Sequence, residues 1–324
     1  MKKRMPRPAP GYGDNGMGKN GSLMKQFKTW GNTITNRKNV GYLFIFPALL
    51  DLFIFVAIPL IAAFYIALTD LDIFLQSPNF VGLSNFTQSF QDERVWNAFK
   101  NTAVYVGVNV PLQLGLALIL AFLLSKPTRF NKLCRTVFYV PVLCSFTAIA
   151  ILFQLLLNST VGYIPYMISW FTGTVESLLS SPRWAMPVVI AISVWKNFGR
   201  SLIIYVAGIL DIPQTYFEAS AIDGASRTQQ FFRITIPNLL PTISFTLLTT
   251  IISSFQVFDA VYVTTGGGPL HKTETVVQYI YLRGFSDPYD LGYASAVCVE
   301  LFTVIAVITL FFKGYLDRRI EKNY

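Results

Sequence analysis

Polar side chains inside long apolar stretches are the residues of this chain whose types and spacing could do chemistry. Ser254, Gln256 and Asp259 lie within one such stretch, and Gln256 and Asp259 stand three residues apart. On a continuous helix that spacing places both side chains on one face. Because a charged group in hydrocarbon costs at least a few kcal/mol, it is expected to face a partner, water or a ligand. These residues could therefore line a water-filled path and bind ligand hydroxyl groups, or they could hold neighbouring helices together.

An earlier apolar stretch carries a second group, in which Trp195 and Asn197 stand on either side of Lys196. Asn197 can bind hydroxyl groups, and the indole ring of Trp195 can stack on the apolar face of a sugar ring. Other aromatic residues with that capacity are Tyr105, Tyr139 and Phe255. Interhelical hydrogen bonds and ion pairs are the alternative role for the ionisable residues within apolar stretches, which are Asp51, Lys196, Asp259 and Glu300. For Asp51 that structural role is favoured.

The residue set gives no support to catalysis. The single histidine, His271, lies in a loop, so neither a Ser-His-acid triad nor a histidine-based metal site is expected. Gly18-Lys19 is followed by Asn20 and does not make a phosphate-binding loop. The run Thr264–Pro269 is rich in glycine but lacks the lysine of such a loop, and it predicts a tight turn. We therefore expect no catalytic residue, no cofactor and no metal.

The elements that must position these residues are membrane-spanning helices. Apolar residues make up 53% of the chain and charged residues 13%, whereas soluble domains carry roughly a quarter charged residues. A helix needs roughly 20 apolar residues to cross the hydrocarbon core. Six segments meet this requirement, although the fourth contains Lys196 and Arg200: residues 43–68, 101–124, 137–157, 186–210, 239–263 and 291–312.

The distribution of lysine and arginine predicts the orientation of these spans. Residues 1–40 hold nine Lys and Arg residues against one acidic residue, and residues 125–136 hold four with no acid, whereas residues 69–100 are rich in acids. Since basic links stay in the cytoplasm, both termini and the loop 211–238 are expected there. The chain then divides into a basic cytoplasmic tail (1–40), a transmembrane domain (41–315) and a cytoplasmic C-terminus (316–324). The tail has no nucleic-acid-binding motif, and we expect no nucleic-acid partner.

The loop 211–238 is expected to be ordered and to form a docking surface. Pro213 permits a helix start, good helix formers follow from Thr215 to Ala225, and Gly224 allows a sharp turn or a close approach. Thr228 to Ile234 can form a second short helix with Phe231 and Phe232 on its apolar side. A merely solvated linker would not need these features.

The pattern Glu218-Ala-Ser, then Gly224, then Ile234-Thr-Ile-Pro237 resembles the EAA loop of ABC importer permeases. Further segments resemble the carbohydrate-uptake branch of that family, which includes the maltose and glycerol-3-phosphate importers: Phe138–Pro141, Trp195–Gly199, Ala207–Pro213, Ser254–Asp259 and Thr265–Pro269. The resemblance covers roughly residues 40–315. Ser220 replaces the second alanine of the EAA core and Ile236 replaces a leucine, but the loop keeps its helix, acid and glycine.

The resemblance implies an all-α fold, the six-helix transmembrane domain of a type I ABC importer in the bacterial inner membrane. It implies partners as well: a second, related permease, two ATPase subunits that bind ATP and Mg, an extracytoplasmic substrate-binding protein, a carbohydrate and the lipid bilayer. The residues expected to couple to the ATPase are Tyr216, Glu218, Ala219, Ser220, Asp223, Gly224, Ala225, Ile234 and Pro237. The candidates for the substrate path are Trp195, Asn197, Ser254, Gln256 and Asp259.

Alternatives to import of a di- or oligosaccharide stay open. Lys196 and the pair His271-Lys272 would suit an acidic oligosaccharide, and glycerol phosphate esters are a further substrate class. An ion-coupled secondary transporter would be expected to show internal repeats, and none is visible in this sequence.

Overall fold

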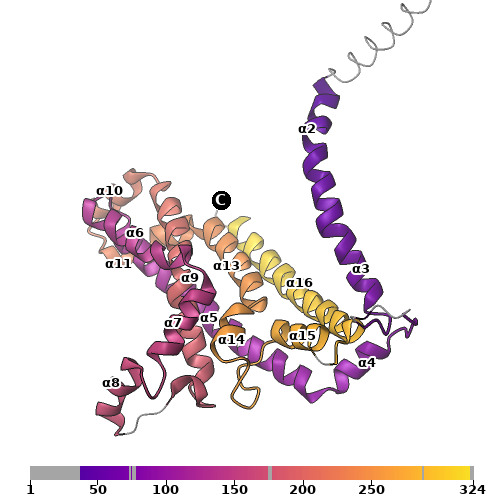
Figure 1. Cartoon of the computed structure of the whole chain (residues 1–324). Helices are drawn as coiled ribbons and strands as arrows, with labels where there is room; N and C mark the ends of the chain where they lie inside the picture. The colour runs from indigo at the N-terminus through magenta and orange to yellow at the C-terminus, as the bar shows by residue number, and fades with distance from the viewer. Residues whose placement is uncertain (1–36, 73, 75–77, 174–176, 287, 322–324) are drawn as a thin grey trace, which may run out of the picture. The chain divides into compact units, whose positions relative to one another are not determined.

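The protein is predominantly helical in the part of the chain that the computed structural model describes, which is residues 37–72, 74, 78–173, 177–286 and 288–321. The long helices are α2 (Arg37–Leu52), α5 (Glu93–Leu124), α6 (Arg129–Leu143), α9 (Ala185–Leu210), α13 (Leu240–Phe255) and α16 (Leu291–Glu321) (Figure 1). The predicted tail 1–40 lies outside these residues except at its end, where α2 begins at Arg37.

Shorter elements connect the long helices. They are η1 (Phe53–Ala57), α3 (Ile58–Ile66), α4 (Ser84–Gln91), α7 (Phe146–Leu156), α8 (Tyr163–Thr172), η2 (Leu178–Ser180), α10 (Gln214–Ile222), α11 (Arg227–Gln230), η3 (Phe231–Thr235), α12 (Ile236–Asn238), α14 (Asp259–Thr264) and α15 (Val276–Phe285). The only β-structure among the described residues is two isolated bridges, Thr69 with Phe80 and Asp72 with Asp290.

Four helices are long and apolar enough to cross a membrane, namely Phe44–Ile66, Glu93–Leu124, Ala185–Leu210 and Leu291–Glu321. Two further pairs qualify only together, because each is bent: Arg129–Leu143 with Phe146–Leu156 by 95°, and Arg227–Asn238 with Leu240–Phe255 by 72°. Counting each bent pair as one span gives up to six, the number that the sequence predicts, but the second pair begins at Arg227, within the predicted loop 211–238, and not at residue 239.

The predicted third span, 137–157, is broken into two helices. It is made of α6, which begins earlier, and α7, and the chain turns sharply between them. Cys144 has an extended backbone with ψ of 147°, and Ser145 with ψ of 139°. Pro141 lacks the N–H that would continue the helical ladder, which favours a break here.

The predicted fifth span, 239–263, also breaks, because α13 ends at Phe255 and α14 starts at Asp259. The Thr275 hydroxyl donates to the carbonyl of Val257 at 3.0 Å. This contact comes from a distant part of the chain and holds the carbonyl outside a helical ladder. Gln256 and Asp259 therefore do not share one helix face, in contrast to the expectation from their spacing.

Two predicted spans are longer than expected. The second begins at Glu93 rather than 101, because the Asp92 carboxylate caps α5 by accepting from the N–H of Arg94 at 2.8 Å. The last span continues in α16 to Glu321, so the predicted boundary at 315/316 falls inside a helix.

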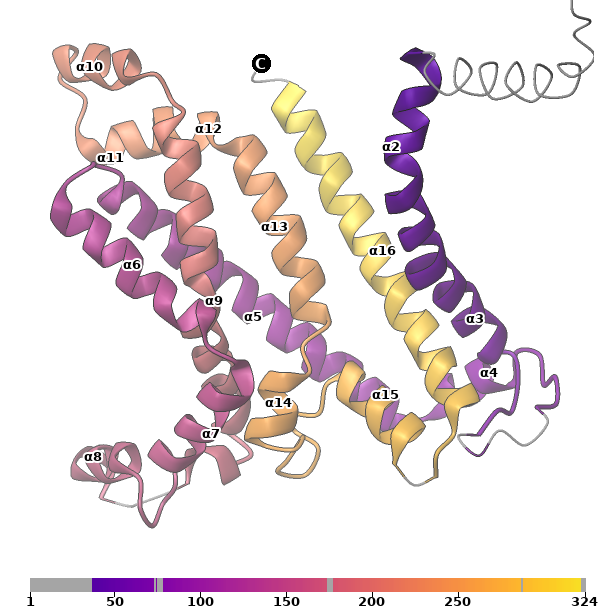
Figure 2. The same cartoon turned by 45° about the horizontal axis from the view of Figure 1, so that its top comes forward.

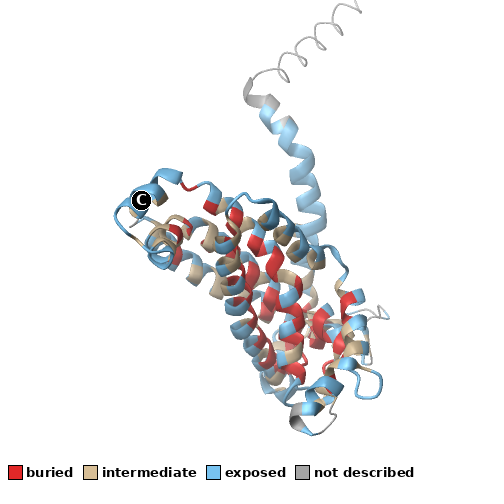
Figure 3. Cartoon of the chain, turned by 90° about the vertical axis from the view of Figure 1, so that its left-hand side faces the viewer, coloured by how far each residue is buried: buried red, intermediate tan, exposed pale blue. Residues whose placement is uncertain are grey.

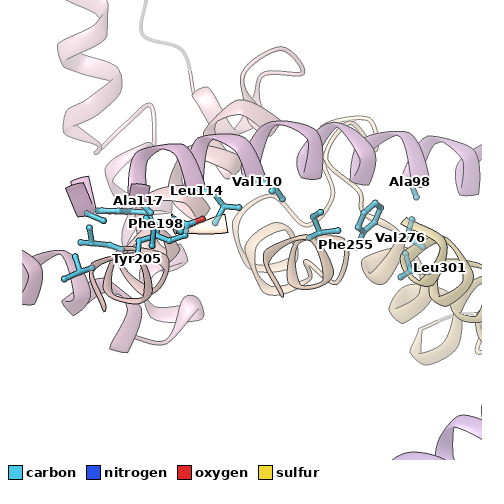
Figure 4. Close-up of a cluster of buried hydrophobic side chains, with 14 of the residues drawn as sticks. Ala98, Val110, Leu114, Ala117, Phe198, Tyr205, Phe255, Val276 and Leu301 are labelled. Atoms are coloured by element: carbon cyan, nitrogen blue, oxygen red, sulfur yellow. The ribbon is translucent and has the colours of Figure 1, made fainter. Parts of the chain in front are cut away.

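The core of residues 63–321 is built around α5. Its buried positions recur at steps of three and four residues, which is the repeat expected of one helix face. Figure 3 shows the buried residues, in red, on the packed helices of this unit. In Figure 4, Leu114 and Val110 of α5 lie in one cluster with Phe198 and Tyr205 of α9 and Phe255 of α13. The first compact unit, residues 1–62, includes α2 and most of α3, and the apolar window of Phe44–Ile66 contains no buried residue.

A glycine fixes the crossing of α6 and α9. A Cβ atom at Gly199 would lie 2.2 Å from the carbonyl oxygen of Phe138. No side chain fits there without moving the backbone, so Gly199 brings α6 against the helix that carries Asn197.

Candidate functional site

The loop that follows α9 is a pair of short helices joined by a glycine turn. Pro213 precedes the first turn of α10, and the helix ends at Ile222. The N–H of Gly224 donates to the carbonyl of Ala221 at 3.1 Å, and the N–H of Ala225 to that of Ser220 at 2.9 Å. With Gly224 at φ of +78°, this is a Schellman C-cap. The predicted sharp turn at Gly224 is confirmed, and a Cβ there would meet no atom within 4 Å.

The second half of the loop is also helical. The Ser226 hydroxyl accepts from the N–H of Gln229, and the Gln229 side chain accepts from the N–H of Ser226, which is a capping box. The helix predicted from Thr228 to Ile234 is present, but it continues through a π-helical segment and α12 to Asn238. Phe231 packs on Phe122 at 5.0 Å between ring centroids.

Hydrogen bonds tie the two halves of the loop together. The Gln230 amide donates to the Ser220 hydroxyl at 3.0 Å and to the carbonyl of Phe217 at 3.2 Å. Ser220, the residue that departs from the EAA pattern, is therefore the acceptor that joins α10 to α11. The role of Gln230 was not predicted, since no local signal in the sequence pairs it with a residue ten positions earlier.

One face of α10 stays open. Tyr216, Glu218, Ala219 and Asp223 are exposed, and Ile222 is exposed by 88%. Of the remaining predicted coupling residues, Ala225 belongs to the Schellman turn, while Ile234 and Pro237 are half-buried where the chain turns towards α13.

A groove of about 620 Å³ separates α10 from the link between α5 and α6. Its apolar wall includes Phe122, Ile212 and Phe217, and its polar rim includes Lys126, Glu218 and Arg227. The rim of the groove thus carries charges of both signs. The α10–α11 loop thus offers an exposed helix with a charged, grooved edge.

A polar pocket of about 210 Å³ lies at the break between α13 and α14. It brings together four of the five predicted path residues: Asn197, Ser254, Gln256 and Asp259. Gln256 and Asp259 reach it from the two sides of the break rather than from one helix face. The pocket and the α10–α11 loop lie at opposite ends of α13 (Figure 2).

The pocket has a further wall that was predicted only in part. Tyr105, which was named as able to stack on a sugar ring, lines it together with Asn109 and Gln113 of α5, Arg200 and Ser253. The Asn109 amide donates to the Ser254 hydroxyl at 3.0 Å, and the Asn109 carbonyl oxygen has no hydrogen-bond partner. The signal was present, since Asn109 and Gln113 stand four apart in an apolar stretch, as on one helix face.

Trp195 is not among the residues that line the pocket. Its ring packs edge-on against Phe153 with 5.6 Å between centroids. Its neighbour Lys196 is only 9% exposed, and the ammonium group lies 5.7 Å from the ring centre of Phe146. Glu300 accepts a hydrogen bond from Ser89, an interhelical contact of the kind expected for a structural role.

A further polar cluster joins α5 to α15 and α16. Partial burial opposes ionisation of Asp92, but hydrogen bonds from the Tyr279 hydroxyl (2.6 Å) and the Tyr293 hydroxyl (2.9 Å) outweigh it and lower the pKa of this carboxyl. Burial, together with the bond to Asp92, raises the pKa of Tyr279 to about 12. Arg94 pairs with the buried Glu274 at 2.7 Å. This cluster fixes the start of α5, whose later turns carry the pocket wall.

Within the described residues, no group of three or more His, Cys, Asp or Glu side chains could hold a metal ion. The arrangement offers hydrogen-bonding groups and opposite charges around a small polar space, which suits binding and passage of a polar molecule.

Comparison with known proteins agrees with this arrangement. Residues 113–322 match the family model of the binding-protein-dependent transport system inner membrane component. The chain is 36% identical over 276 residues to the probable ABC transporter permease protein YesP of Bacillus subtilis (strain 168), covering 83% of this chain and 88% of the relative. It is 31% identical over 285 residues to the sn-glycerol-3-phosphate transport system permease protein UgpA of Agrobacterium fabrum, covering 88% of this chain and 97% of UgpA.

A solved structure is similar as well. It is a crystal structure of a bacterial alginate ABC transporter in complex with an alginate pentasaccharide-bound periplasmic protein. The TM-score is 0.78 at 26% identity, and the match covers 89% of this chain and 97% of that chain. The chain therefore belongs to the family of inner membrane components of binding-protein-dependent transport systems, and it has the fold of a type I ABC importer permease.

Proposed function

We propose that this chain is a non-catalytic subunit of an ATP-driven, binding-protein-dependent carbohydrate importer and forms half of its translocation path. A second, related permease forms the other half, two ATPase subunits bind and hydrolyse ATP, and an extracytoplasmic protein delivers the substrate. The subunit lies in the bacterial inner membrane with both termini and the α10–α11 loop on the cytoplasmic side. The distribution of Lys and Arg supports this orientation.

The observation that carries the proposal is the exposed, internally braced α10. Its coupling residues are Tyr216, Glu218, Ala219, Ser220, Asp223, Gly224 and Ala225, with Ile234 and Pro237 at the return to α13. An ATPase can move a permease only through a surface that it contacts differently in its open and closed states. The Ser220–Gln230 bond and the Gly224 turn let α10 and α11 move as one piece. ATP binding would close the ATPase dimer, draw this piece inward and open the path towards the binding protein.

The polar pocket supports a carbohydrate as the substrate. Asn197, Ser254, Gln256 and Asp259 offer donors and acceptors that suit hydroxyl groups. The similar structure points the same way, since it is named for the polysaccharide alginate, whereas UgpA is named for glycerol 3-phosphate, which belongs to the second candidate class. Trp195 remains a weaker candidate because it does not line the pocket.

An acidic oligosaccharide or a glycerol phosphate ester is the second candidate. Arg200 lines the same pocket, and a guanidinium can pair with a carboxylate or a phosphate. Asp259 in the same pocket would repel a strongly anionic ligand, so we place a neutral di- or oligosaccharide first.

The test is reconstitution of the complete complex in proteoliposomes, with the second permease, the ATPase subunits and the cognate binding protein. We expect uptake of a labelled carbohydrate that requires both ATP and the binding protein. Glu218→Lys should abolish uptake and the stimulation of ATP hydrolysis by loaded binding protein, because reversal of an interfacial charge is repulsive. Uptake driven by an ion gradient without ATP would contradict the proposal.

A further inference from the structure

The short helix α8 carries an exposed apolar face that belongs neither to the α10–α11 loop nor to the polar pocket. Tyr163, Tyr166, Met167 and Trp170 are each between 57% and 76% exposed. Steps of three and four residues separate these side chains, so they lie on one side of the helix. We call these four residues the α8 face. The ten residues of α8 include no Lys, Arg, Asp or Glu, so no charge interrupts this face.

The other side of α8 is fixed to the membrane domain. Pro165 is buried, and Ile164 packs on the apolar cluster that joins α7 to α9. A Cβ atom at Gly162 would overlap the carbonyl oxygen of Leu156, so the chain turns tightly at the end of α7 and no side chain fits at that turn. The contact and the turn together hold the start of α8 level with the end of α7.

The position of α8 in the chain places it at the edge of the bilayer. One candidate span ends at Leu156 and the next begins at Ala185, and α8 lies in the link between them. In Figures 1 and 2, α8 lies next to α7, at the end of the molecule opposite the α10–α11 loop. Trp184, which is 46% exposed, precedes α9, and the guanidinium of Arg183 lies 5.7 Å from its ring centre. Tryptophan and arginine at the end of a span are typical of the membrane–water interface.

We propose that the α8 face binds the bilayer surface, with its rings between the lipid headgroups and the first part of the acyl chains. This inference goes beyond the proposed function and requires neither a carbohydrate nor a particular orientation of the chain. Tyrosine and tryptophan suit this position, because the ring can enter the apolar edge while the O–H or N–H stays with headgroups and water. The exposed side of α7 is apolar too, at Ile151, Leu152 and Leu155, so the surface available to lipid continues from α7 to α8.

Two protein partners are the alternatives to lipid. A binding protein that docks and leaves would expose the α8 face to water in every cycle, and transient interfaces are about as polar as the rest of a protein surface. The α8 face also has no charge that could steer such a partner. The second permease is expected across the translocation path, but no residue of α8 lines the polar pocket. The bilayer is present throughout the cycle and needs no charge on the face, so it accounts best for these features.

The experiment places a nitroxide spin label on the α8 face of the complete complex, in nanodiscs of phosphatidylethanolamine and phosphatidylglycerol. A cysteine replaces Met167 in a variant without Cys134, Cys144 and Cys298. A cysteine that replaces Leu270, an exposed apolar residue of the loop after α14, is the matched control. The relaxation of the label is measured with oxygen, which concentrates in hydrocarbon, and with a water-soluble nickel chelate. We expect oxygen to exceed the chelate severalfold at position 167, and the chelate to exceed oxygen at position 270.

A second substitution tests whether the rings hold α8 at this depth. Trp170→Gln should raise the relaxation of the label at position 167 by the nickel chelate, because glutamine does not favour the interface as tryptophan does. Trp170→Phe keeps an aromatic ring and should leave the relaxation as it is in the labelled parent. An equal result for both variants would contradict the role of the ring.

Three further outcomes would overturn the proposal. Strong relaxation by the chelate at position 167 of the parent would place the α8 face in water. Weak relaxation by both reagents would place it against another protein subunit. Protection that appears only after loaded binding protein is added would identify that protein as the partner. If Met167→Cys does not assemble, Tyr163→Cys, one turn earlier on the same face, gives the same test.

Discussion

The α10–α11 loop and the polar pocket are built by opposite means. The loop is exposed, and its defining contacts join residues close in sequence, such as Ser220 and Gln230. The pocket is lined by helices far apart in sequence, and the hydrogen bond between Asn109 and Ser254, 145 positions apart, holds its wall. A docking surface can thus be a rigid local unit, whereas a path through the membrane domain depends on the packing of the whole domain.

The largest expected effect is a difference in thiol labelling between the two sides of the membrane. In a variant without Cys134, Cys144 and Cys298, a cysteine replacing Thr228 in the loop should resist an impermeant thiol reagent in intact cells. A cysteine replacing Leu270, which is 80% exposed beyond α14, should react fully. The Lys and Arg distribution is the physical reason. Labelling of position 228 from outside would contradict the predicted orientation. Labelling in permeabilised cells is the control that shows whether position 228 is accessible at all.

Gly224→Pro should break the loop without disturbing the pocket. Proline cannot adopt the φ of +78° found at Gly224, and it removes the N–H that donates to Ala221. The cost of about 3 kcal/mol should separate α10 from α11, and ATP-driven uptake should fall at least about tenfold with the protein still in the membrane. Gly224→Asn is the matched control, since asparagine tolerates the left-handed conformation. Equal uptake by both variants would remove the turn from the coupling mechanism.

Two substitutions in the pocket should have different results. Asp259 is exposed in the pocket, so Asp259→Asn should slow uptake roughly tenfold, the value of a hydrogen bond to a charged group. Asn109 is buried, and Asn109→Leu removes the donor to Ser254, which costs about 1–3 kcal/mol. We expect this variant to lower the melting temperature and yield of the complex. Loss of the complex in Asp259→Asn would assign that residue to packing.

The smallest effect is expected from Ser220→Ala, which restores the alanine of the EAA pattern. It removes the acceptor of the Gln230 bond at a cost of about 1 kcal/mol, so the melting temperature should fall slightly and uptake should remain within about twofold. Ser169→Ala is the matched control, because its hydroxyl also donates to the carbonyl three residues earlier but joins no second helix. An identical change in both variants would show that the Ser220–Gln230 bond does not brace the loop.

The local features of the loop could be predicted from the sequence. Pro213 and Gly224 mark the limits of the first helix by backbone chemistry that needs no tertiary context. The predicted helix from Thr215 to Ala225 accordingly agrees with α10, Gln214–Ile222, to within the turn that ends it.

The pocket could be predicted only in part. Gln256 and Asp259 do lie together, but the assumed continuous helix is wrong, because the bond from Thr275 to Val257 holds a break between them. That contact joins residues 18 positions apart, and periodicity within one apolar stretch cannot reveal it. Asn109 was not predicted, because a polar residue only lowers the mean hydropathy of a span. Hydropathy does not indicate that the residue contacts another helix.

The first apolar helix has a consequence for the biogenesis of the protein. Its window in Phe44–Ile66 has a mean hydropathy of 2.5 and no buried residue, whereas that in Ala185–Leu210 has 1.3 and is 61% buried. Leu, Ile and Phe side chains each favour insertion, so their summed free energy can offset the unfavourable insertion of Asp51. The first segment can then enter the bilayer without other helices. The segment with Lys196 and Arg200 needs neighbouring helices before it becomes stable in lipid. Insertion is therefore expected to begin with Phe44–Ile66, which needs no other helix. The retention of α9 in the membrane is expected to depend on helices that are already inserted.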